Sequence, residues 1–417
     1  MKNNKFDIVI VGGGVVGASV AYELSKDSSL SIALIDIKKP GNATQASAGG
    51  LWAIGESVGL GCGVIFFKTL SKKRQENHGV IGEVARPHQL PPFFFDFCLK
   101  SNDMFPGLYK ELIELGACDF KLEKTGLKFI MYDQDDLKYA QGIYNSIPHL
   151  KDQMAWLNQE ELIIDEPFIN KKAIGALEFL KDDQVNPYLL MNSFRDGARI
   201  NGAEIIKGEV TDVEVINGKV QSVTVNDGKI HCNTVVNAAG AWAKEIGNMV
   251  GLSLPIEPVK GQVLLSEKLP PIMRSCISTS DCYIAQKDNG EVLIGSTTEN
   301  IGYETSGSLS HLRSLAAGAV KALPLLRNID CKRTWAGLRP GTPDEVPILG
   351  PVDGIEGYLN ACGHFRTGIL TSAITARIIS DLVNDNEPII DLKPFLLDRF
   401  SKKVVNHSVE KMEDILT

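Results

Sequence analysis

A glycine-spaced turn between a strand-like and a helix-like segment constrains the fold of this chain more than any other feature. Residues 6–11 (FDIVIV) form an unbroken apolar run of strand-forming residues. The turn GGGVVG at 12–17 follows, and residues 18–26 have the composition of a helix. A second strand is predicted over 31–35, and Asp36 ends it. Strand, G-x-G-x-x-G turn, helix, strand and acid, in this order, are the fingerprint of dinucleotide binding in its required context.

Each glycine of the turn has its own expected role. Gly12 permits the tight turn, Gly14 lets the backbone approach a pyrophosphate, and Gly17 lets helix and strand pack closely. The pyrophosphate then rests on the free N–H groups at the N-terminal end of the helix. Asp36 lies nineteen residues after Gly17, where it can accept hydrogen bonds from ribose hydroxyls. A glycine-rich loop without a ligand is the alternative, and the complete context favours a dinucleotide cofactor.

Length, charge and cysteine content narrow the class of protein. The 417 residues are many for one hydrophobic core, so two domains are expected. The net charge of −8 gives no basic surface on average, which argues against nucleic acid as a partner. No apolar run approaches the ~20 residues of a membrane-spanning helix, and a strand predicted from residue 6 leaves no room for a secretory signal. The eight cysteines contain no C-x-x-C pair, which predicts reduced thiols in a cytoplasmic setting, and no histidine cluster suggests a metal.

Segments suited to a nucleotide recur along the chain. The loop 40–51 (PGNATQASAGGL) is rich in small residues that let the backbone pass close to a ligand, although a plain flexible loop is the alternative. A strand over 230–241 also ends in small residues, and a long helix is predicted over 369–384. Because other strands separate these segments, we expect one discontinuous nucleotide-binding domain and an inserted β-rich domain that covers the cofactor.

Two further stretches have a less certain place in the fold. Alternating residues over 204–225 predict a three-stranded meander with turns at Gly208 and at Asn217-Gly218. Apolar patches at 64–67 (VIFF) and 91–97 (PPFFFDF) are expected to belong to the core, a membrane-facing patch or a partner surface. Of these three, we expect burial in the core, although three phenylalanines after two prolines are not typical of a strand.

Five segments together resemble the FAD-dependent amine and amino-acid oxidoreductases, which include D-amino-acid oxidase, glycine oxidase and sarcosine oxidase. In chain order these segments are the fingerprint, PGNATQASAGG, TVVNAAGAW, WAGLRPGTPDEVPILG and GHFRTGIL. The resemblance spans roughly residues 6 to 400. It implies an α/β fold (α+β overall) like that of glycine oxidase, with a Rossmann-like FAD-binding domain and an antiparallel β-rich substrate domain. The expected boundaries are 1–88, 150–255 and 335–400 for the first domain, 89–149 and 256–334 for the second, and 401–417 for a surface tail.

Within this superfamily, three segments look most like the C subunits of bacterial hydrogen cyanide synthases. They are ASAGGLWAIGESVGLGCGVIFF, TSDCYIAQKDNGEVLIGSTTE and LNACGHFRTGILTSAIT. This resemblance implies that hydride transfer from Cα of glycine to flavin N5 gives an imine, which is oxidised further to hydrogen cyanide and carbon dioxide. It also implies a complex with other redox subunits, which lies peripherally on the cytoplasmic side of the cell membrane. Residues 59–67 are the expected contact with such a partner, and packing in the core is the alternative for this segment.

Two other functions stay open on the sequence. One is an FAD-dependent dehydrogenase or oxidase of another small amino acid, a secondary amine or an opine. The other is a flavin electron-relay or scaffold subunit whose partner does the chemistry. An arginine placed to hold a carboxylate argues against a relay, since a relay has no need of one.

The resemblance also assigns residues to FAD. Residues 363–368 are expected to open the last helix, so that its free N–H groups face flavin N1 and O2, where charge builds up on reduction. Gly337 stands where sarcosine oxidases have the cysteine that anchors the flavin, which predicts non-covalent FAD. The matching contacts are Val15 and Val16 at the pyrophosphate, Asp36 and Ile37 at the ribose, Ala43, Thr44, Ala48, Gly49 and Gly50 along the diphosphate and isoalloxazine, Val210 at the adenine, and Gly363, His364, Phe365, Arg366, Thr367, Gly368, Ile369 and Leu370 at the flavin pyrimidine edge.

On the substrate side, Arg339 matches the residue that holds the substrate carboxylate in glycine oxidase. A guanidinium suits that task because its planar fork donates two parallel N–H bonds and stays charged in a closed pocket. Tyr283 matches a tyrosine whose hydroxyl assists, and Arg366 matches a second arginine beside the flavin. Asp281 and Thr298 match pocket-lining positions. A structural ion pair for either arginine, packing for the tyrosine and a turn cap for Asp281 are the alternatives.

Overall fold

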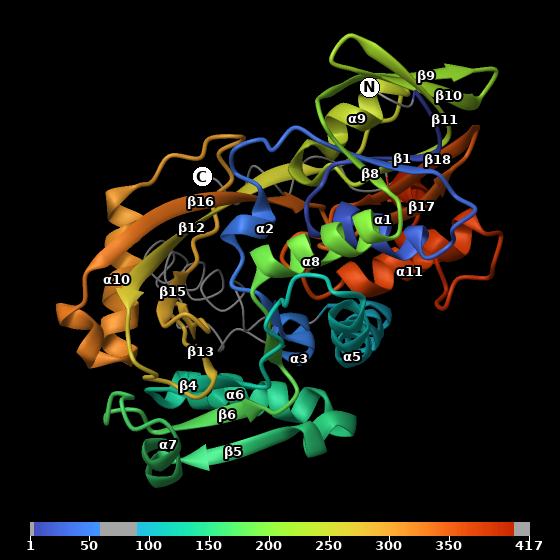
Figure 1. Cartoon of the computed structure of the whole chain (residues 1–417). Coiled ribbons are helices and arrows are strands. Elements are labelled where there is room, and N and C mark those ends of the chain that lie inside the picture. The colour runs from blue at the N-terminus through green and yellow to red at the C-terminus, as the bar shows by residue number, and fades with distance from the viewer. Residues whose placement is uncertain (1–3, 59–89, 404–417) are drawn as a thin grey trace.

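The computed structural model describes residues 4–58 and 90–403, whose strands form two eight-stranded sheets and one two-stranded ribbon (Figure 1). The segments 59–67 and 64–67, and the end of the tail from 404, lie outside the described residues. The ribbon pairs β3 (Gly50–Leu51) with β7 (Asp183–Gln184).

The first sheet is built around the strand that leads into the fingerprint turn. β1 pairs in parallel with the second strand, β2, on one side and with β11 on the other. The strand order is β17-β18-β10-β11-β1-β2-β8, with β9 paired to β10 and β18 also paired to β11. The bounds are β1 Lys5–Val11, β2 Ile32–Asp36, β8 Glu204–Lys207, β9 Val210–Ile216, β10 Lys219–Val225, β11 Gly228–Asn237, β17 Ile348–Val352 and β18 Ile355–Cys362.

Both faces of β1 are buried, which explains its unbroken apolar sequence. Ile8 and Ile10 face a core that they share with the helices α1 (Val15–Ser25), α8 (Pro187–Ile200) and α11 (Ser372–Val383). Phe6, Val9 and Val11 face the opposite core, which the hairpin β9–β10 and the helix α9 (Ala243–Met249) cover. The parallel centre of the sheet therefore carries helices on one face and a hairpin with a helix on the other.

One expectation about local structure is wrong and another is confirmed. The predicted meander over 204–225 is only a β9–β10 hairpin, because β8 pairs in parallel with β2 instead of with β9. The patch at 91–97 begins the long helix α5 (Pro92–Leu115), where a proline at the first turn costs no hydrogen bond. Phe94 and Phe97 on α5 are buried in the core of α1, α8 and α11, so the core interpretation of this patch is confirmed.

The second sheet carries the other strands in the order β16-β12-β15-β14-β13-β4-β6-β5. Helix α6 packs on one face, and α7 and α10 pack on the other. Figure 1 shows the long strands β12 and β16 running from α10 toward the first sheet. The bounds are β4 Leu127–Met131, β5 Met154–Asn158, β6 Gly175–Phe179, β12 Glu257–Lys268, β13 Cys276–Ser278, β14 Tyr283–Gln286, β15 Glu291–Gly295, β16 Cys331–Gly341, α6 Gln134–Ser146, α7 Gln159–Asp165 and α10 Leu309–Ala322.

The sheets follow the expected domain boundaries only in part. Strands β5 and β6 lie beyond residue 150 and nevertheless belong to the second sheet. Helix α5 lies beyond residue 89 and packs in the core of the first sheet. A division into two discontinuous domains stays a prediction, and its boundaries would have to move at these two places.

The close packing of α1 on its turn generates a stability prediction. A Cβ at Gly17 would overlap the carbonyl oxygen of Gly12, which is backbone and cannot swing away. We expect Gly17→Ala to lower the free energy of unfolding by about 2 kcal/mol or more, the usual cost of overpacking, and to lower the thermal midpoint measured by circular dichroism. Gly107→Ala is the matched control, since Gly107 lies in helix α5 with open space around its Cβ position. A midpoint for Gly17→Ala equal to that of the control would contradict the prediction.

Candidate functional site

A cavity of about 500 Å³ is lined by residues from both large sheets. At one end lie the fingerprint turn, the end of β2 at Asp36 and the start of β9 at Val210. At the other end lie Arg339 on β16 and Tyr283 on β14. The predicted nucleotide residues and the predicted carboxylate-binding residues therefore line one continuous space.

The fingerprint turn has the geometry that its sequence predicts. Gly12 has φ = 104°, and a Cβ there would overlap the carbonyl of Ala238 on the neighbouring strand. At Gly14, by contrast, the nearest atom to the place that a Cβ would take is Oγ1 of Thr44 at 3.4 Å, an ordinary contact, and this glycine lines the cavity. Helix α1 begins at Val15 with no side-chain cap and no acidic residue in its first turn. The N–H of Val15 donates to Oγ1 of Thr44 at 3.0 Å, and no acid in the first turn competes with a pyrophosphate for the other N-terminal N–H groups.

Asp36 is held in place by an arginine that sequence reasoning missed. Arg195 on α8 forms an ion pair with the carboxylate, with Nη2 2.5 Å from Oδ2, and also donates to the carbonyl oxygen of Gly13. The other carboxylate oxygen accepts a hydrogen bond from the backbone N–H of Lys38 at 3.2 Å. Each oxygen has a second lone pair, so Asp36 can still accept hydrogen bonds from ribose hydroxyls. Arg195 therefore ties the fingerprint turn to the acid at the end of β2.

The small-residue loop after β2 is ordered by its own polar side chains. Asn42 caps the short helix α2 (Ala43–Ala46) by accepting a hydrogen bond from the N–H of Thr44 at 2.9 Å. Oγ1 of Thr44 in turn accepts a hydrogen bond from the N–H of Val15 at 3.0 Å. The loop is therefore no plain flexible segment. Among its predicted contacts Ala43, Thr44, Ala48 and Gly50 line the cavity, and Gly49 does not.

The expected opening of the last helix at 363–368 is wrong. Helix α11 begins at Ser372, and the residues before it form turns in which the N–H of Thr367 donates to the carbonyl of His364. His364 is buried and bonded to the hydroxyl of Thr375 at 3.0 Å, and burial lowers its pKa to about 3, so the imidazole is neutral. Of the predicted stretch, His364, Phe365, Arg366, Gly368 and Ile369 line the cavity, while Gly363, Thr367 and Leu370 do not.

Arg339 is positioned by β12 and by the segment that follows β15. Its Nη1 donates to the carbonyl oxygen of Thr297 at 3.1 Å, and its Nη2 donates to the hydroxyl of Ser296 at 2.6 Å. The guanidinium lies against Gly261 of β12, where a Cβ would come within 2.5 Å of Nη1. A glycine at position 261 is thus required for the observed direction of the arginine.

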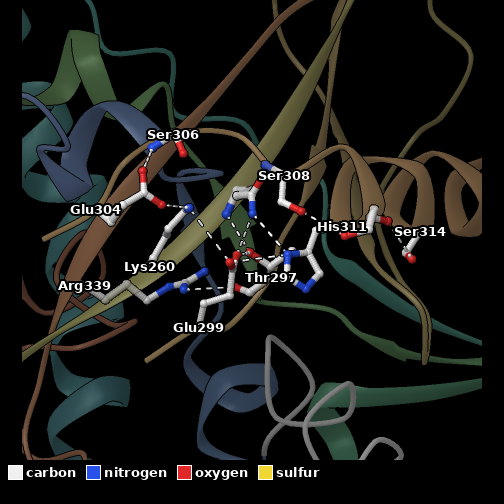
Figure 2. A network of polar contacts seen from close by, with 11 residues as sticks. Lys260, Thr297, Glu299, Glu304, Ser306, Ser308, His311, Ser314 and Arg339 are labelled. Carbon is white, nitrogen blue, oxygen red and sulfur yellow. Dashed lines mark hydrogen bonds and ion pairs between the residues drawn. The ribbon is translucent and has the colours of Figure 1, made fainter. Parts of the chain in front are cut away.

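A polar network behind Arg339 fixes the segment that receives it (Figure 2). Glu299 accepts a hydrogen bond from Nε2 of Gln262 at 2.7 Å and lies 3.3 Å from Nδ1 of His311. The backbones of Lys260 and Glu299 exchange two hydrogen bonds, and Nζ of Lys260 reaches Glu304 at 2.9 Å. Because Lys260 and Gln262 are buried on β12, this network holds the chain from Thr297 to Glu299 against the strand that also bears Gly261.

Tyr283 reaches the same place from β14. Its hydroxyl lies over Gly295, the residue before Ser296, because β14 and β15 pair Tyr283 with Gly295. Trp52 packs edge-on against its ring with centroids 5.7 Å apart. The hydroxyl of Tyr283 and the guanidinium of Arg339 therefore converge on one short segment, as two donors for a single carboxylate would.

A second charged group borders the cavity on the side of helix α3 (Ala53–Ser57). Arg366 pairs with Glu345 at 2.9 Å, and its Nε lies 3.4 Å from Oε2 of Glu56. Asp182 accepts hydrogen bonds from the N–H groups of Ile54 and Gly55 and so holds the start of α3. Burial raises the pKa of Asp182 to about 7 and also raises the pKa of Glu56, which the charges of Arg366 and Arg339 hold down in part.

Two predicted pocket residues lie elsewhere. Asp281 is exposed and forms an ion pair with Lys321 of α10 at 2.8 Å, so neither a substrate contact nor the turn-cap alternative describes its side chain. Thr298 is exposed and is not among the residues that line the cavity. Both lie just outside the strands β14 and β15, in segments that reach the cavity through Tyr283 and Ser296.

Four residues of the site were missed by sequence reasoning: Arg195, Glu56, Trp52 and Gly261. Arg195 lies in a helix remote from the fingerprint in sequence, and nothing local indicates its partner. Trp52 and Glu56 follow closely on the small-residue loop in sequence. Their place beside a predicted ligand-binding segment could have indicated that they belong to the site.

Comparison with known proteins agrees with this geometry. The family model described as FAD dependent oxidoreductase matches residues 7–382. The chain belongs to this family. Its predicted α/β fold and its FAD cofactor are thereby confirmed, as is the resemblance to amino-acid oxidoreductases.

Individual relatives of this FAD-dependent oxidoreductase cover nearly its whole length. It is 52% identical over 97% of its length to hydrogen cyanide synthase subunit HcnC of Pseudomonas protegens, of which it covers 99%. It is 54% identical over 95% of its length to HcnC of Pseudomonas aeruginosa, of which it covers 97%. The crystal structure of glycine oxidase from Geobacillus kaustophilus matches with a TM-score of 0.83 and 28% identity, over 95% of this chain and 99% of that one.

The residues of the cavity fit FAD. Gly14 and the start of α1, which line the cavity with no acid in the first turn of the helix, suit the pyrophosphate, and Asp36 suits the ribose. A Cβ at Gly337 would lie 2.5 Å from Cβ of Ala46, so this position has no room for a cysteine side chain as the chain is folded. The same observation supports the prediction of non-covalent FAD.

The contact between Gly261 and Arg339 generates a prediction. In Gly261→Ala the new methyl group displaces the guanidinium, and we expect the dissociation constant of acetate, read from the change in flavin absorbance, to rise by about tenfold or more, as for one lost charged hydrogen bond. Gly307→Ala is the control, because a Cβ there makes only an ordinary contact at 3.5 Å with Leu312. Acetate binding that is equal in both variants would show that Arg339 does not hold the carboxylate.

Proposed function

We propose that this flavoprotein oxidises glycine to an imine and then to hydrogen cyanide and carbon dioxide, as the catalytic subunit of a complex. The observation that carries the proposal is the convergence of Arg339 and Tyr283 at the end of the FAD cavity, where they form a site for a small carboxylate. The identity of 52% and 54% to two HcnC subunits supports the choice of glycine and of cyanide as product. An electron-relay subunit would have no use for such a carboxylate site.

Bound FAD supplies the acceptor for the hydride that leaves Cα. The chain itself supplies binding and orientation. The fork of Arg339 and the hydroxyl of Tyr283 bind the substrate carboxylate, and Trp52 packs edge-on against the tyrosine ring and lines the cavity with it. Fixing the carboxylate at one end of the cavity directs the Cα–H bond toward the hydride acceptor. This lowers the entropic part of the activation barrier for hydride transfer.

Cyanide requires a second oxidation of the same molecule. Loss of a hydride and of carbon dioxide from iminoacetate leaves hydrogen cyanide, so glycine gives up four electrons and four protons in all. Water would hydrolyse the imine to glyoxylate and ammonia before that step. The low exposure of Trp52 (3%) and of the Arg366 side chain (6%) favours retention of the imine away from water.

The electrons are proposed to pass to other redox subunits of a complex, because the two relatives are named as subunits. None of the helices in residues 4–58 and 90–403 has the length and apolar character needed to cross a membrane.

The products of glycine oxidation test this proposal. We expect anaerobic glycine to bleach the flavin of the purified chain, and the co-expressed complex with a dye acceptor to release cyanide, because the imine is retained for a second oxidation. Cyanide, glyoxylate and ammonia are measured together. Glyoxylate and ammonia without cyanide would indicate a dehydrogenase or oxidase that releases its imine, and a flavin that stays oxidised would indicate a relay.

The mode of FAD attachment gives a separate prediction. Because Gly337 offers no thiol and no room for one, acid precipitation is expected to release all of the yellow cofactor into the supernatant. The measurement is the flavin absorbance of supernatant and pellet. Flavin that stays with the precipitated chain would show a covalent bond at some other residue.

A further inference from the structure

Glu56 is an acidic residue in the cavity for which the proposed carboxylate site has no use. It lies on the short helix α3 and lines the cavity together with Arg339, Arg366 and Tyr283. Its side chain is 12% exposed. A buried carboxylate in a binding site is costly unless it meets a positive charge or a donor.

The polar contacts of Glu56 are incomplete. Its Oε2 lies 3.4 Å from Nε of Arg366, and this oxygen accepts no hydrogen bond from any of the described residues. Arg366 makes its shorter ion pair, at 2.9 Å, with Glu345. Glu56 therefore retains acceptor capacity in a place where solvent supplies few donors.

The helix that carries Glu56 is held firmly. Asp182 accepts hydrogen bonds from the N–H groups of Ile54 at 3.0 Å and Gly55 at 2.6 Å, and the N–H of Glu56 donates to the carbonyl of Trp52 at 2.9 Å. Trp52 also packs on Tyr283. One rigid turn of chain thus fixes Glu56 relative to the tyrosine of the carboxylate site.

A zwitterionic amino acid brings two opposite charges to this cavity. Its carboxylate end matches Arg339 and Tyr283, and its ammonium end then needs an anion. The charged groups that face Glu56 from the surrounding elements are Arg366, Arg339, Glu345 and Asp182. Glu56 is the acid of this group that lines the cavity, whereas Glu345 and Asp182 are engaged with Arg366 and with the start of α3.

We propose that Glu56 binds the ammonium group of the substrate and takes one proton from it before the hydride leaves Cα. This inference rests on the proposed function. In the step one N–H bond breaks and one O–H bond forms, so the ammonium becomes a neutral amine and the carboxylate a carboxylic acid. No oxidant takes part. The neutral amine has the lone pair that must delocalise toward Cα as the C–H bond breaks.

The burial of Glu56 suits this role. Desolvation raises its pKa and the two arginines oppose the rise, so its basicity lies above that of an exposed glutamate. Only the ionised carboxylate accepts the proton. The rate of flavin reduction at low glycine concentration should therefore fall as the pH drops through the pKa of Glu56.

The variant Glu56→Gln tests the proposal in the FAD-loaded full-length chain. Anaerobic stopped-flow mixing with glycine measures the rate constant of flavin bleaching and the dissociation constant of glycine across pH. At pH 7 we expect a loss of at least a hundredfold in the rate constant, the usual contribution of a general base. The loss should diminish about tenfold per pH unit toward the pKa of free glycine, since the amine then arrives deprotonated.

Acetate separates this role from a merely structural one, because it has a carboxylate and no amine. We expect Glu56→Gln to weaken glycine binding while acetate binding stays unchanged or tightens, since a negative charge near Arg339 is removed. Glu345→Gln is the matched control: it removes the other acid beside Arg366 and should keep the shape of the pH profile. Glu56→Asp should restore part of the rate.

Each outcome decides the inference. A loss that is equal at every pH, or a parallel loss of acetate binding, would overturn it and show that Glu56 only supports the fold of the site. If glycine does not bleach the wild-type flavin, the proposed function fails. Calorimetric binding of glycine and acetate to both forms then still shows whether Glu56 holds the ammonium group.

Discussion

The direction of one guanidinium decides what this cavity can bind. Arg339 donates to the carbonyl of Thr297 and to the hydroxyl of Ser296, and lies flat on Gly261. These two acceptors are neutral, so the contacts with them orient the side chain without cancelling its charge. Neutral acceptors leave the positive charge of a guanidinium to attract a substrate carboxylate, whereas anionic ones would compete with it. The proposed carboxylate site thus includes two hydrogen-bond acceptors that are not ions.

Further hydrogen bonds behind Arg339 keep those two acceptors in place. Glu299 gathers contacts from Gln262 and His311, and its backbone pairs with Lys260, so the segment after β15 is fastened to β12. β12 also supplies Gly261 and pairs along its length with β16, which carries Arg339. Strand, arginine and acceptor are therefore parts of one hydrogen-bonded unit. Movement of any of them would be resisted by the others, which is what a preorganised binding site needs.

The fingerprint end of the fold was predictable and the substrate end only partly so. The turn at 12–17 carries its signal locally, because backbone conformation and close packing demand glycine at fixed spacing. Arg339 and Tyr283 were identified by resemblance, whereas the exposed residues Asp281 and Thr298 lie outside the ends of β14 and β15 and do not line the cavity. The pairing of β8 with β2 and the start of α11 at Ser372 were missed as well. Contacts between residues remote in sequence decide which of several structures a local sequence pattern adopts.

The cavity shows how opposite charges can share a small buried space. Arg339, Arg366 and Glu56 line the proposed substrate end, and one close ion pair joins Arg366 to Glu345, which does not line the cavity. Arg339 and Glu56 also line the cavity and are of opposite sign, as are the two ends of the amino acid that we propose as substrate. A simple carboxylic acid would satisfy only one of these two residues and leave the other desolvated, which is costly. On the roles proposed for Arg339 and Glu56, this cost favours an amino acid over a plain acid.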